Sequence, residues 1–535
     1  MGVTRDEQTP APDRPPAGAG PAEGSTGVGG RHVAPSFGRA VGLTVLGAVV
    51  PGVAFLAAGR RRLGLVTLTV FLLVVAGAVW LATAGRRTAV RASVDPTQLT
   101  WLVAAIVAAA TLWVIVVLAG YRMLLPRRAR GWQHAVGTLV VLLLVGAVVA
   151  PSVAGVRLAN TQRGLIDSVF ADDRQSATIV PPPDAADPFG DKERVNVLLL
   201  GGDGGAGREG VRTDTVIVAS IETATGRTTL FSLPRNLENL PFPASSPLAA
   251  LYPRGFVGAS ESEGLLNAVY RNGPATYPDA LGPSSDPGAD WLKLGVGEAL
   301  GLPIDYFVLV NLDGFSQLVD ALGGITVNVN YYVPVGGEPT RGILPDSYIA
   351  PGPDQTMSGP RALDFARGRF GLSDYQRMDR QRCVLDAIVA AADPVTLLSQ
   401  YQRLAATTAQ IVSTDIPQAV LSDFVDLAFL VKDAGIRSVV FDDTVIDPAY
   451  PDYPRIRSLV QQALGADTAA PTGPGGTTAP TTAPTTTAPT PAAVPTTPAP
   501  APTGAVGDDV SNVCAYDPVA AQAAIAAGQP PTRGG

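Results

Sequence analysis

The sequence predicts an α/β domain with a mixed central β-sheet flanked by helices, preceded by an α-helical transmembrane region. Two observations lead to this fold class. Between about residues 191 and 465, short segments rich in β-branched residues alternate with segments of helical period, as in layered α/β folds. Long apolar stretches precede them, and hydrophobic residues make up 46% of the chain, which indicates membrane helices.

The chain begins with residues 1–38, which are rich in Pro, Gly and Ala and predict a disordered cytoplasmic tail. A membrane region is predicted at residues 39–158. Its four apolar stretches are residues 40–58, 63–84, 99–119 and 136–157. The first carries Gly47, Pro51 and Gly52 at its middle, which indicates a re-entrant or interfacial segment rather than a span. It also starts too late for a cleavable signal peptide, so we expect none.

The positions of three arginine clusters predict how these stretches are oriented across the membrane. The clusters are Arg60, Arg61 and Arg62, then Arg86, Arg87 and Arg91, then Arg122, Arg127, Arg128 and Arg130. With three spans, the first and third clusters are cytoplasmic and only the Arg86 group is external, in line with the positive-inside rule. Everything after about residue 158 then lies outside the cell membrane. The alternative is a four-span protein with a cytoplasmic domain.

Five segments of the following region have the pattern of strands, and three of them are nearly all apolar, as buried strands are. They are VNVLLLG, TDTVIVASI, TTLFSL, DYFVLVNL and ITVNVN. Helical period is found in DGFSQLVDALGG, in SDYQRMDRQRCVLDAIVAA and in much of residues 395–435. Gly323–Gly324 is a stop signal for the first of these helices.

The predicted organisation after the membrane region has five parts. They are a linker (159–190), the α/β domain (191–395), a C-terminal helical extension (396–465), a Pro/Thr-rich linker (466–506) and a cysteine-containing tail (507–535). The Pro/Thr-rich linker is expected to be extended, which suits a protein that works within a thick envelope.

Histidine and cysteine usage excludes several chemistries. The only histidines, His32 and His134, lie outside the α/β domain, which excludes Ser-His-Asp, Cys-His and His-metal sites there. Two cysteines, Cys383 and Cys514, are too few for a Cys-rich zinc site or an iron–sulfur cluster. Outside the cell they are a disulfide candidate. A net charge of −7 and the lack of a helix-turn-helix pattern argue against nucleic acid as a partner.

The stretch GGDGGAGREGVRTDT, residues 201–215, places two carboxylates at strand ends. Asp203 follows a buried strand through a glycine-rich turn, and Asp214 opens the next strand after Arg212. Such a pair suits Mg²⁺, which takes few protein oxygens together with substrate phosphates. The alternative is a polar turn in which Asp and Gly only satisfy turn geometry.

Arginines gather in two further places. In SLPRN, residues 232–236, Pro234 ends a predicted strand and Arg235 follows directly after it. Site residues of α/β sheets often lie just past the ends of strands. In ARGRFGLSDYQRMDRQR, residues 366–382, Arg367 and Arg369 approach a helix that Ser373 would cap. That helix carries Asp374, Arg377 and Gln381 on one face. The guanidinium group of arginine can donate two parallel hydrogen bonds to phosphate oxygens. A site with several arginines and aspartates and no histidine therefore indicates phosphoryl transfer.

These residues match a known family. NVLLLGGD, RTDT, SLPRN, LPIDYFVLVNLDGFSQLVDALGGITVNV and ARGRFGLSDYQRMDRQR resemble the LytR-CpsA-Psr family, in order, over about residues 194–395. The resemblance implies a membrane-anchored, extracytoplasmic phosphotransferase that takes a glycopolymer from a polyprenyl pyrophosphate carrier. The acceptor would be peptidoglycan, joined through a phosphodiester. An apolar tunnel would hold the lipid.

The resemblance also implies roles for individual residues. Asp203 and Asp214 would bind Mg²⁺ (or Mn²⁺), and Asp374 would orient arginine or aid deprotonation. The residues implied to hold or border the phosphates are Arg212, Arg235, Arg367, Arg369, Arg377 and Gln381. The sequence departs from the family pattern at two positions: Asn236 stands where many members have aspartate, and Leu266, before Asn267, stands where a lysine is often seen.

Two other readings of the same site stay open. Water in place of the wall acceptor would give a polyprenyl-pyrophosphate-type hydrolase. A non-enzymatic protein that binds lipid intermediates, with a regulatory role, is the other.

Overall fold

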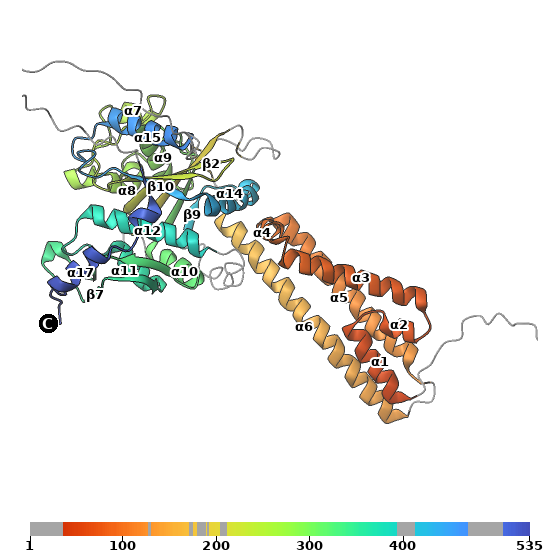
Figure 1. The fold of residues 1–535 in the computed structure, drawn as a ribbon. Helices are drawn as coiled ribbons and strands as arrows, with labels where there is room; N and C mark the ends of the chain where they lie inside the picture. Colours follow the sequence, from red (N-terminus) through yellow and green to blue (C-terminus); the bar gives the residue numbers. More distant parts are fainter. Residues whose placement is uncertain are drawn as a thin grey trace, which may run out of the picture. The chain divides into compact units, whose positions relative to one another are not determined.

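The computed structural model describes residues 36–126, 130–170, 175–178, 189, 192–203, 211–392, 412–468 and 507–534 (Figure 1). The chain divides into two compact units, which are described separately. One comprises Met1–Ala78 and Ala108–Ser152, and the other comprises Val79–Val107 and Val153–Gly535.

Six helices make up the N-terminal region: α1 (Phe37–Val49), α2 (Val53–Ala57), α3 (Arg61–Ala82), α4 (Arg86–Val94), α5 (Pro96–Leu124) and α6 (Gly131–Val169). The first apolar stretch is broken between α1 and α2, as predicted, where Pro51 precedes Gly52 with φ 105°. Within the described residues, three helices are long and apolar enough to cross a membrane: α3, α5 and α6.

Helix α6 extends beyond the predicted apolar stretch of residues 136–157 at both ends. Its 39 residues span about 58 Å at 1.5 Å per residue, well beyond the ~30 Å hydrocarbon core of a bilayer. The predicted linker boundary at residue 159 therefore cuts a continuous helix. Apolar residues continue at helical spacing past that point, and Ala159, Leu165, Ile166 and Val169 are buried.

A seven-stranded mixed sheet forms the centre of the second unit, in the order β11-β10-β3-β2-β1-β4-β9. The strands are β1 (Arg194–Gly202), β2 (Thr213–Glu222), β3 (Thr228–Leu233), β4 (Tyr306–Asn311), β9 (Val412–Thr414), β10 (Ile436–Val440) and β11 (Asp508–Asp509). The pairs β1–β4 and β10–β3 are parallel, and the other pairs are antiparallel. The predicted mixed sheet is confirmed.

Helices cover both faces of this sheet (Figure 1). Because side chains alternate along a strand, Leu198 packs into one core, and Leu199 faces the opposite side. The first face is covered by α8 (Leu266–Thr276), α9 (Pro287–Leu300) and α15 (Tyr453–Thr468), with Trp291 fully buried between them. The second face carries α10 (Leu312–Ala321), α11 (Gly359–Arg367) and α12 (Asp374–Ala391).

Smaller elements complete the unit. Two two-stranded sheets pair β5 (Ile325–Val329) with β8 (Gly352–Met357) and β6 (Val333–Val335) with β7 (Ser347–Ile349). The other described helices of the unit are α7 (Pro247–Leu251), η1 (Glu261–Glu263), η2 (Pro339–Arg341), η4 (Gln418–Val420), α14 (Leu421–Ala434), α16 (Val510–Val513) and α17 (Pro518–Ala527). The predicted strand ITVNVN is therefore present as β5, but outside the central sheet. The first part of the predicted helical region at 395–435 lies outside the described residues.

The predicted domain boundary at residue 395 divides the sheet. Strands β9 and β10 lie within the predicted helical extension, and β11 lies within the predicted tail. Strand β10 pairs in parallel with β3, and its Val439 is buried in the main core. The described parts of 396–465 and 507–535 thus complete both edges of the sheet.

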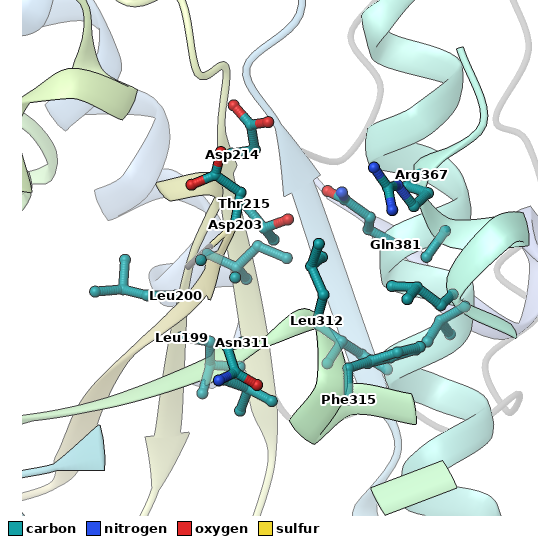
Figure 2. Close-up of a pocket in the computed structure, with 18 of the residues that line it drawn as sticks. Leu199, Leu200, Asp203, Asp214, Thr215, Asn311, Leu312, Phe315, Arg367 and Gln381 are labelled. Atoms are coloured by element: carbon teal, nitrogen blue, oxygen red, sulfur yellow. The ribbon is translucent and has the colours of Figure 1, made fainter. Parts of the chain in front are cut away.

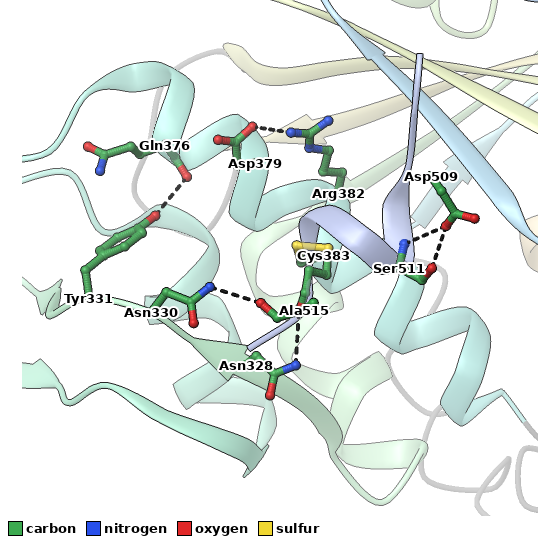
Figure 3. Close-up of a disulfide and its surroundings, with 11 residues drawn as sticks. Asn328, Asn330, Tyr331, Gln376, Asp379, Arg382, Cys383, Asp509, Ser511 and Ala515 are labelled. Atoms are coloured by element: carbon green, nitrogen blue, oxygen red, sulfur yellow. Dashed lines mark hydrogen bonds and ion pairs between the residues drawn. A yellow bond between two sulfur atoms is a disulfide. The ribbon is translucent and has the colours of Figure 1, made fainter. Parts of the chain in front are cut away.

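The C-terminal tail is fixed to helix α12 by a disulfide between Cys383 and Cys514 (Figure 3). The two residues are 131 positions apart, with a Cα–Cα distance of 5.4 Å. Around the disulfide, Asn328 Nδ2 donates to the carbonyl of Cys514 at 3.0 Å, and Val510 is fully buried. The tail therefore supports the helix that carries the second half of the arginine-rich stretch.

Candidate functional site

A cavity of about 330 Å³ lies between the central sheet and helices α10, α11 and α12 (Figure 2). Its walls are mostly apolar. The apolar lining comprises Leu199, Leu200, Ile217, Val308 and Val310 from the sheet, and Leu312, Phe315, Leu318, Leu363, Ala366, Val384, Leu385 and Ile388 from the helices. Its volume lies at the lower end of the range for small-molecule sites, about 300–1,000 Å³.

One end of the cavity is polar. Figure 2 shows Asp203 and Asp214 on the sheet side, with Arg367 and Gln381 facing them from the helices. Arg369 and Arg377 line the same cavity. The site therefore joins an apolar channel to a cluster of guanidinium and carboxylate groups.

A β-bulge directs Asp214 into this cavity. Gly201 pairs with Thr215 and Gly202 pairs with Thr213, so Asp214 is an extra residue on β2. As a result both Asp214 and Thr215 line the cavity, although neighbouring side chains of a regular strand point to opposite faces. A Cβ atom on Gly201 would lie 2.9 Å from Cβ of Thr215, so the close pairing beside the bulge requires glycine.

The start of α12 fixes the register of its polar residues. Ser373 Oγ accepts from the backbone N–H of Gln376 at 3.1 Å, and Gln376 Oε1 accepts from the backbone N–H of Ser373 at 2.9 Å. This capping box sets where the helix begins. Arg377 and Gln381 of α12 consequently both line the cavity.

Asp374 connects three arginines of the cluster. Its Oδ2 lies 3.0 Å from Arg377 Nη2 and 3.4 Å from Arg235 Nε, and its Oδ1 lies 3.7 Å from Arg369 Nη1. Both carboxylate oxygens are thus engaged by guanidinium groups. Asp374 is placed to orient the arginines.

Asp214 is held by groups that favour its charged form. Its Oδ1 accepts from Arg235 Nη1 at 3.2 Å and from Asn267 Nδ2 at 3.0 Å. Burial raises the pKa of Asp214, but the hydrogen bond from Asn267 and the charges of Arg235 and Arg377 outweigh burial, so this pKa lies below its ordinary value. Asp214 is therefore a carboxylate at neutral pH.

Arg377 and Arg369 each have a guanidinium N–H donor that is not hydrogen-bonded to the described residues. Burial lowers the pKa of Arg377 to about 10, so it stays protonated at neutral pH. Its Nη2 also donates to the backbone carbonyl of Asp214 at 3.2 Å. Within the described part of the chain, Arg377 Nε and Arg369 Nη1 are buried without a hydrogen-bond partner. Buried unpaired donors are costly, and anionic oxygens in the cavity would satisfy them.

Not all arginines of residues 366–382 join the cluster. Arg380 Nε donates to the carbonyl of Phe365 at 2.7 Å, and Arg382 Nη2 donates to Asp379 Oδ1 at 2.7 Å. Both side chains are buried and serve packing.

Arg212 is placed differently from the expectation. Its guanidinium pairs with Glu263, which also accepts from Arg271 and Asn272, and it does not line the cavity. Its backbone N–H, however, donates to Asp203 Oδ1 at 2.7 Å. The structure therefore gives Arg212 a part in positioning Asp203 through its main chain.

The carboxylates fit a magnesium ion that is completed by substrate oxygens. No group of three or more His, Cys, Asp or Glu side chains that could hold a metal occurs in the described ranges. Asp203 and Asp214 line the same polar end of the cavity. Mg²⁺ is usually bound by one or two carboxylates plus phosphates, so this donor set suits it.

One residue that contacts Asp214, Asn267, was not among the predicted site residues. Asn267 is 3% exposed and is anchored on α8, from which it reaches Asp214. The tertiary contact between α8 and β2 brings Asn267 next to Asp214, and no local sequence pattern indicates this contact.

A family model described as the LytR_cpsA_psr family matches residues 166–447. Polyisoprenyl-teichoic acid--peptidoglycan teichoic acid transferase TagU of Oceanobacillus iheyensis is 28% identical, over 54% of this chain and 79% of the relative. Biofilm regulatory protein A of Streptococcus mutans is 25% identical, over 52% of this chain and 62% of the relative. The crystal structure of B. subtilis TagV is 22% identical, over 51% of this chain and 97% of that chain, with a TM-score of 0.35.

Proposed function

Because the chain belongs to the LytR-CpsA-Psr family, whose model matches just over half of it, we propose that it is a membrane-anchored phosphotransferase of cell wall assembly. It joins a glycopolymer from a polyprenyl-pyrophosphate carrier to peptidoglycan through a phosphodiester. The observation that carries the proposal is the apolar cavity that ends in arginines and aspartates. This shape suits a donor with a prenyl chain at one end and a diphosphate next to it. The name of the relative TagU, a teichoic acid transferase, supports the same reaction class.

The proposed chemistry balances as a displacement at phosphorus. A hydroxyl of the acceptor attacks the phosphorus that bears the glycan, and the bond from that phosphorus to the bridging oxygen breaks. The products are the glycan phosphodiester, prenyl phosphate and a proton. Arg369 and Arg377 would stabilise the negative charge that develops on the phosphate oxygens. Asp374, which forms ion pairs with Arg235, Arg369 and Arg377, would orient them rather than act as the base.

We propose Mg²⁺ (or Mn²⁺) as the cofactor, held by Asp203 and Asp214. When bound, the ion would neutralise charge on the diphosphate. We expect a chelator to abolish transfer and added Mg²⁺ to restore it. Asp203→Asn should raise the Mg²⁺ concentration needed for half-maximal rate by about tenfold or more. The reason is that the site would lose one of its two carboxylate ligands, and Mg²⁺ is usually bound by only one or two. Asp279→Asn, at an exposed position outside the cavity, is the control. An unchanged transfer rate after chelation would show that the reaction does not require Mg²⁺ or Mn²⁺.

The pH dependence of transfer should report on Asp214. Since its pKa is lowered in the folded protein, its charge persists until the pH falls through that lowered value. Asn267→Ala removes a hydrogen bond to the charged form, so the pKa should rise and the acid limb of the pH–rate profile should move to higher pH. Asn272→Ala, on the same helix but bonded to Glu263, should leave the limb in place. An unmoved limb in Asn267→Ala would show that this bond does not tune Asp214.

We propose that the chain crosses the membrane three times and that the α/β domain is extracytoplasmic. In support, α4, which follows α3, contacts α14 of the domain unit, and Arg91 Nη1 lies 2.7 Å from Asp426 Oδ2. This contact supports placing the segment between α3 and α5 on the same side of the membrane as the domain. The third arginine cluster, next to α6, would be cytoplasmic.

Cysteine labelling tests this topology, because both native cysteines are in a disulfide. In intact cells, a membrane-impermeant thiol reagent should label Arg86→Cys. Arg130→Cys should react only after the membrane is opened. Labelling in the opposite pattern would place the domain in the cytoplasm.

A product assay tests the reaction itself. The full chain in detergent is mixed with a short-chain prenyl-pyrophosphoryl sugar, Mg²⁺ and peptidoglycan fragments, and the products are followed by mass spectrometry. The proposal expects a glycan linked to peptidoglycan through one phosphate, lost in Asp214→Ala. Free sugar phosphate with no linked product would instead make the protein a hydrolase. Tight lipid binding without any product would make it a binding protein.

A further inference from the structure

A second hollow, the aromatic groove, lies in the same unit and outside the cavity described above. It has a volume of about 520 Å³. Its sides come from the chain that follows β3, with Asn239, Tyr252 and Arg254, and from the chain that follows β10, with Tyr450 and Tyr453. None of these residues lines the cavity that ends in the arginine cluster.

The side chains of the aromatic groove have the chemistry of a carbohydrate site. Tyr450 is 84% exposed, which is unusual for a large aromatic side chain that borders a hollow. The Arg254 side chain is exposed and has no hydrogen bond or ion pair to any described residue. Flat aromatic rings offer apolar contact to the C–H faces of sugars, and guanidinium and amide groups donate to their hydroxyls.

Charge narrows the class of ligand. Arg254 is the one charged residue among the groove's lining residues within the described ranges, and no carboxylate lines it. A cationic ligand would find no partner there. A neutral or weakly acidic glycan would meet both the aromatic rings and the free guanidinium.

The groove is built from fixed backbone. Asn239 has φ 52° and Gly255 has φ 92°, and a Cβ atom on Gly255 would lie 2.1 Å from the carbonyl oxygen of Asn239. Only glycine permits this close approach. Tyr453 Oη donates to the carbonyl of Glu238 at 2.6 Å, which ties the second side of the groove to the first. A pre-formed groove loses little freedom when a ligand binds.

The groove lies close along the chain to Arg235, which with Arg369 and Arg377 is one of the arginines around Asp374. Arg235, which contacts both Asp214 and Asp374, is four residues before Asn239, so their Cα atoms are at most about 14 Å apart. The backbone N–H of Glu238, between them, donates to the carbonyl of Pro448 at 2.9 Å, close in sequence to Tyr450. A chain molecule seated in the groove could extend to the phosphates at the cluster.

We propose that the aromatic groove is a carbohydrate-binding subsite that holds the glycan strand of the acceptor. The inference rests on the proposed function, because it assigns the groove to the second substrate of that reaction. It gives the side chains of Tyr450 and Arg254, which have no hydrogen bond or ion pair to the described residues, a role in binding the acceptor glycan beside the donor site.

Binding of a soluble glycan strand, prepared from peptidoglycan and free of lipid, tests the assignment with the full chain in detergent. Tyr450→Ala and Arg254→Ala should each weaken binding by about tenfold, as expected for residues at the centre of a contact. Tyr450→Phe keeps the ring and should bind almost as the unchanged protein does. Arg455→Ala removes an exposed arginine that does not line the groove and should have no effect.

Donor binding and transfer are measured on the same variants. The proposal expects unchanged affinity for a prenyl diphosphate and a raised KM for the glycan acceptor, with little change in kcat. Equal glycan affinity in all variants, no glycan binding by the unchanged protein, or binding of a Pro/Thr-rich peptide in place of the glycan would overturn the groove assignment. If the unchanged protein transfers nothing to peptidoglycan, the proposed function fails, whatever the groove binds.

Discussion

Replacing Arg369 by alanine will lower kcat/KM for glycopolymer transfer by about 10²–10³-fold, the loss typical of removing one group that stabilises transition-state charge. Arg369 lines the polar end of the cavity, and its Nη1 is buried without a hydrogen-bond partner among the described residues. Its link to Asp374 is a 3.7 Å ion pair, which leaves the guanidinium available to a phosphate. Steady-state kinetics with a prenyl-pyrophosphoryl sugar provide the measurement.

Two further variants make this result specific. Arg369→Lys keeps the charge but loses the two-pronged donor geometry, so its activity should lie between the unchanged protein and Arg369→Ala. Arg341→Ala removes an exposed arginine outside the cavity and should leave the rate unaltered. Equal rates for Arg369→Ala and Arg341→Ala would rule out the phosphate role of Arg369.

Loss of the disulfide is expected to have the largest effect on stability. The link between Cys383 and Cys514 closes a loop with a sequence separation of 131. In the chain-entropy model, opening a loop of that size costs on the order of 4–5 kcal/mol. We expect Cys514→Ser to lower the free energy of unfolding of the α/β domain by that order, measured by denaturant unfolding of the full chain in detergent.

Loss of the disulfide should also alter the apolar cavity. Val384 and Leu385, which follow Cys383 on α12, line the apolar cavity, and Leu385 packs in the same cluster as Val510 and Cys514. Cys514→Ser should therefore weaken prenyl diphosphate binding as well. Ser511→Ala, which changes the tail but keeps the disulfide, is the matched control. A Cys514→Ser protein that unfolds at the same denaturant concentration would show that the disulfide adds no stability.

Much of the fold followed from local sequence patterns. Apolar runs marked β1 to β4, and the Ser373 cap with helical spacing placed Arg377 and Gln381 on one side of α12. These features depend on residues that are close in sequence, and their physical causes are local.

Features that depend on distant partners were not predictable. Strand β10 is only five residues long, and its place beside β3 is decided by the burial of Val439 in the main core. Asp214 reaches the cavity because of a bulge that the register of β1 and β2 creates. The pairing of Arg212 with Glu263 and the bond from Asn267 to Asp214 likewise need the tertiary structure.

The central claim is that the apolar cavity holds the prenyl chain while the arginines hold its diphosphate. The most direct test is the affinity of the full chain for a short-chain prenyl diphosphate, measured for Leu385→Trp beside Val257→Trp. Leu385 lines the cavity, whereas Val257 is 57% exposed and outside it. The account predicts that filling the cavity with Leu385→Trp abolishes prenyl diphosphate binding and that Val257→Trp leaves it intact. Unchanged affinity in a folded Leu385→Trp protein would contradict the account, because the lipid would then bind elsewhere.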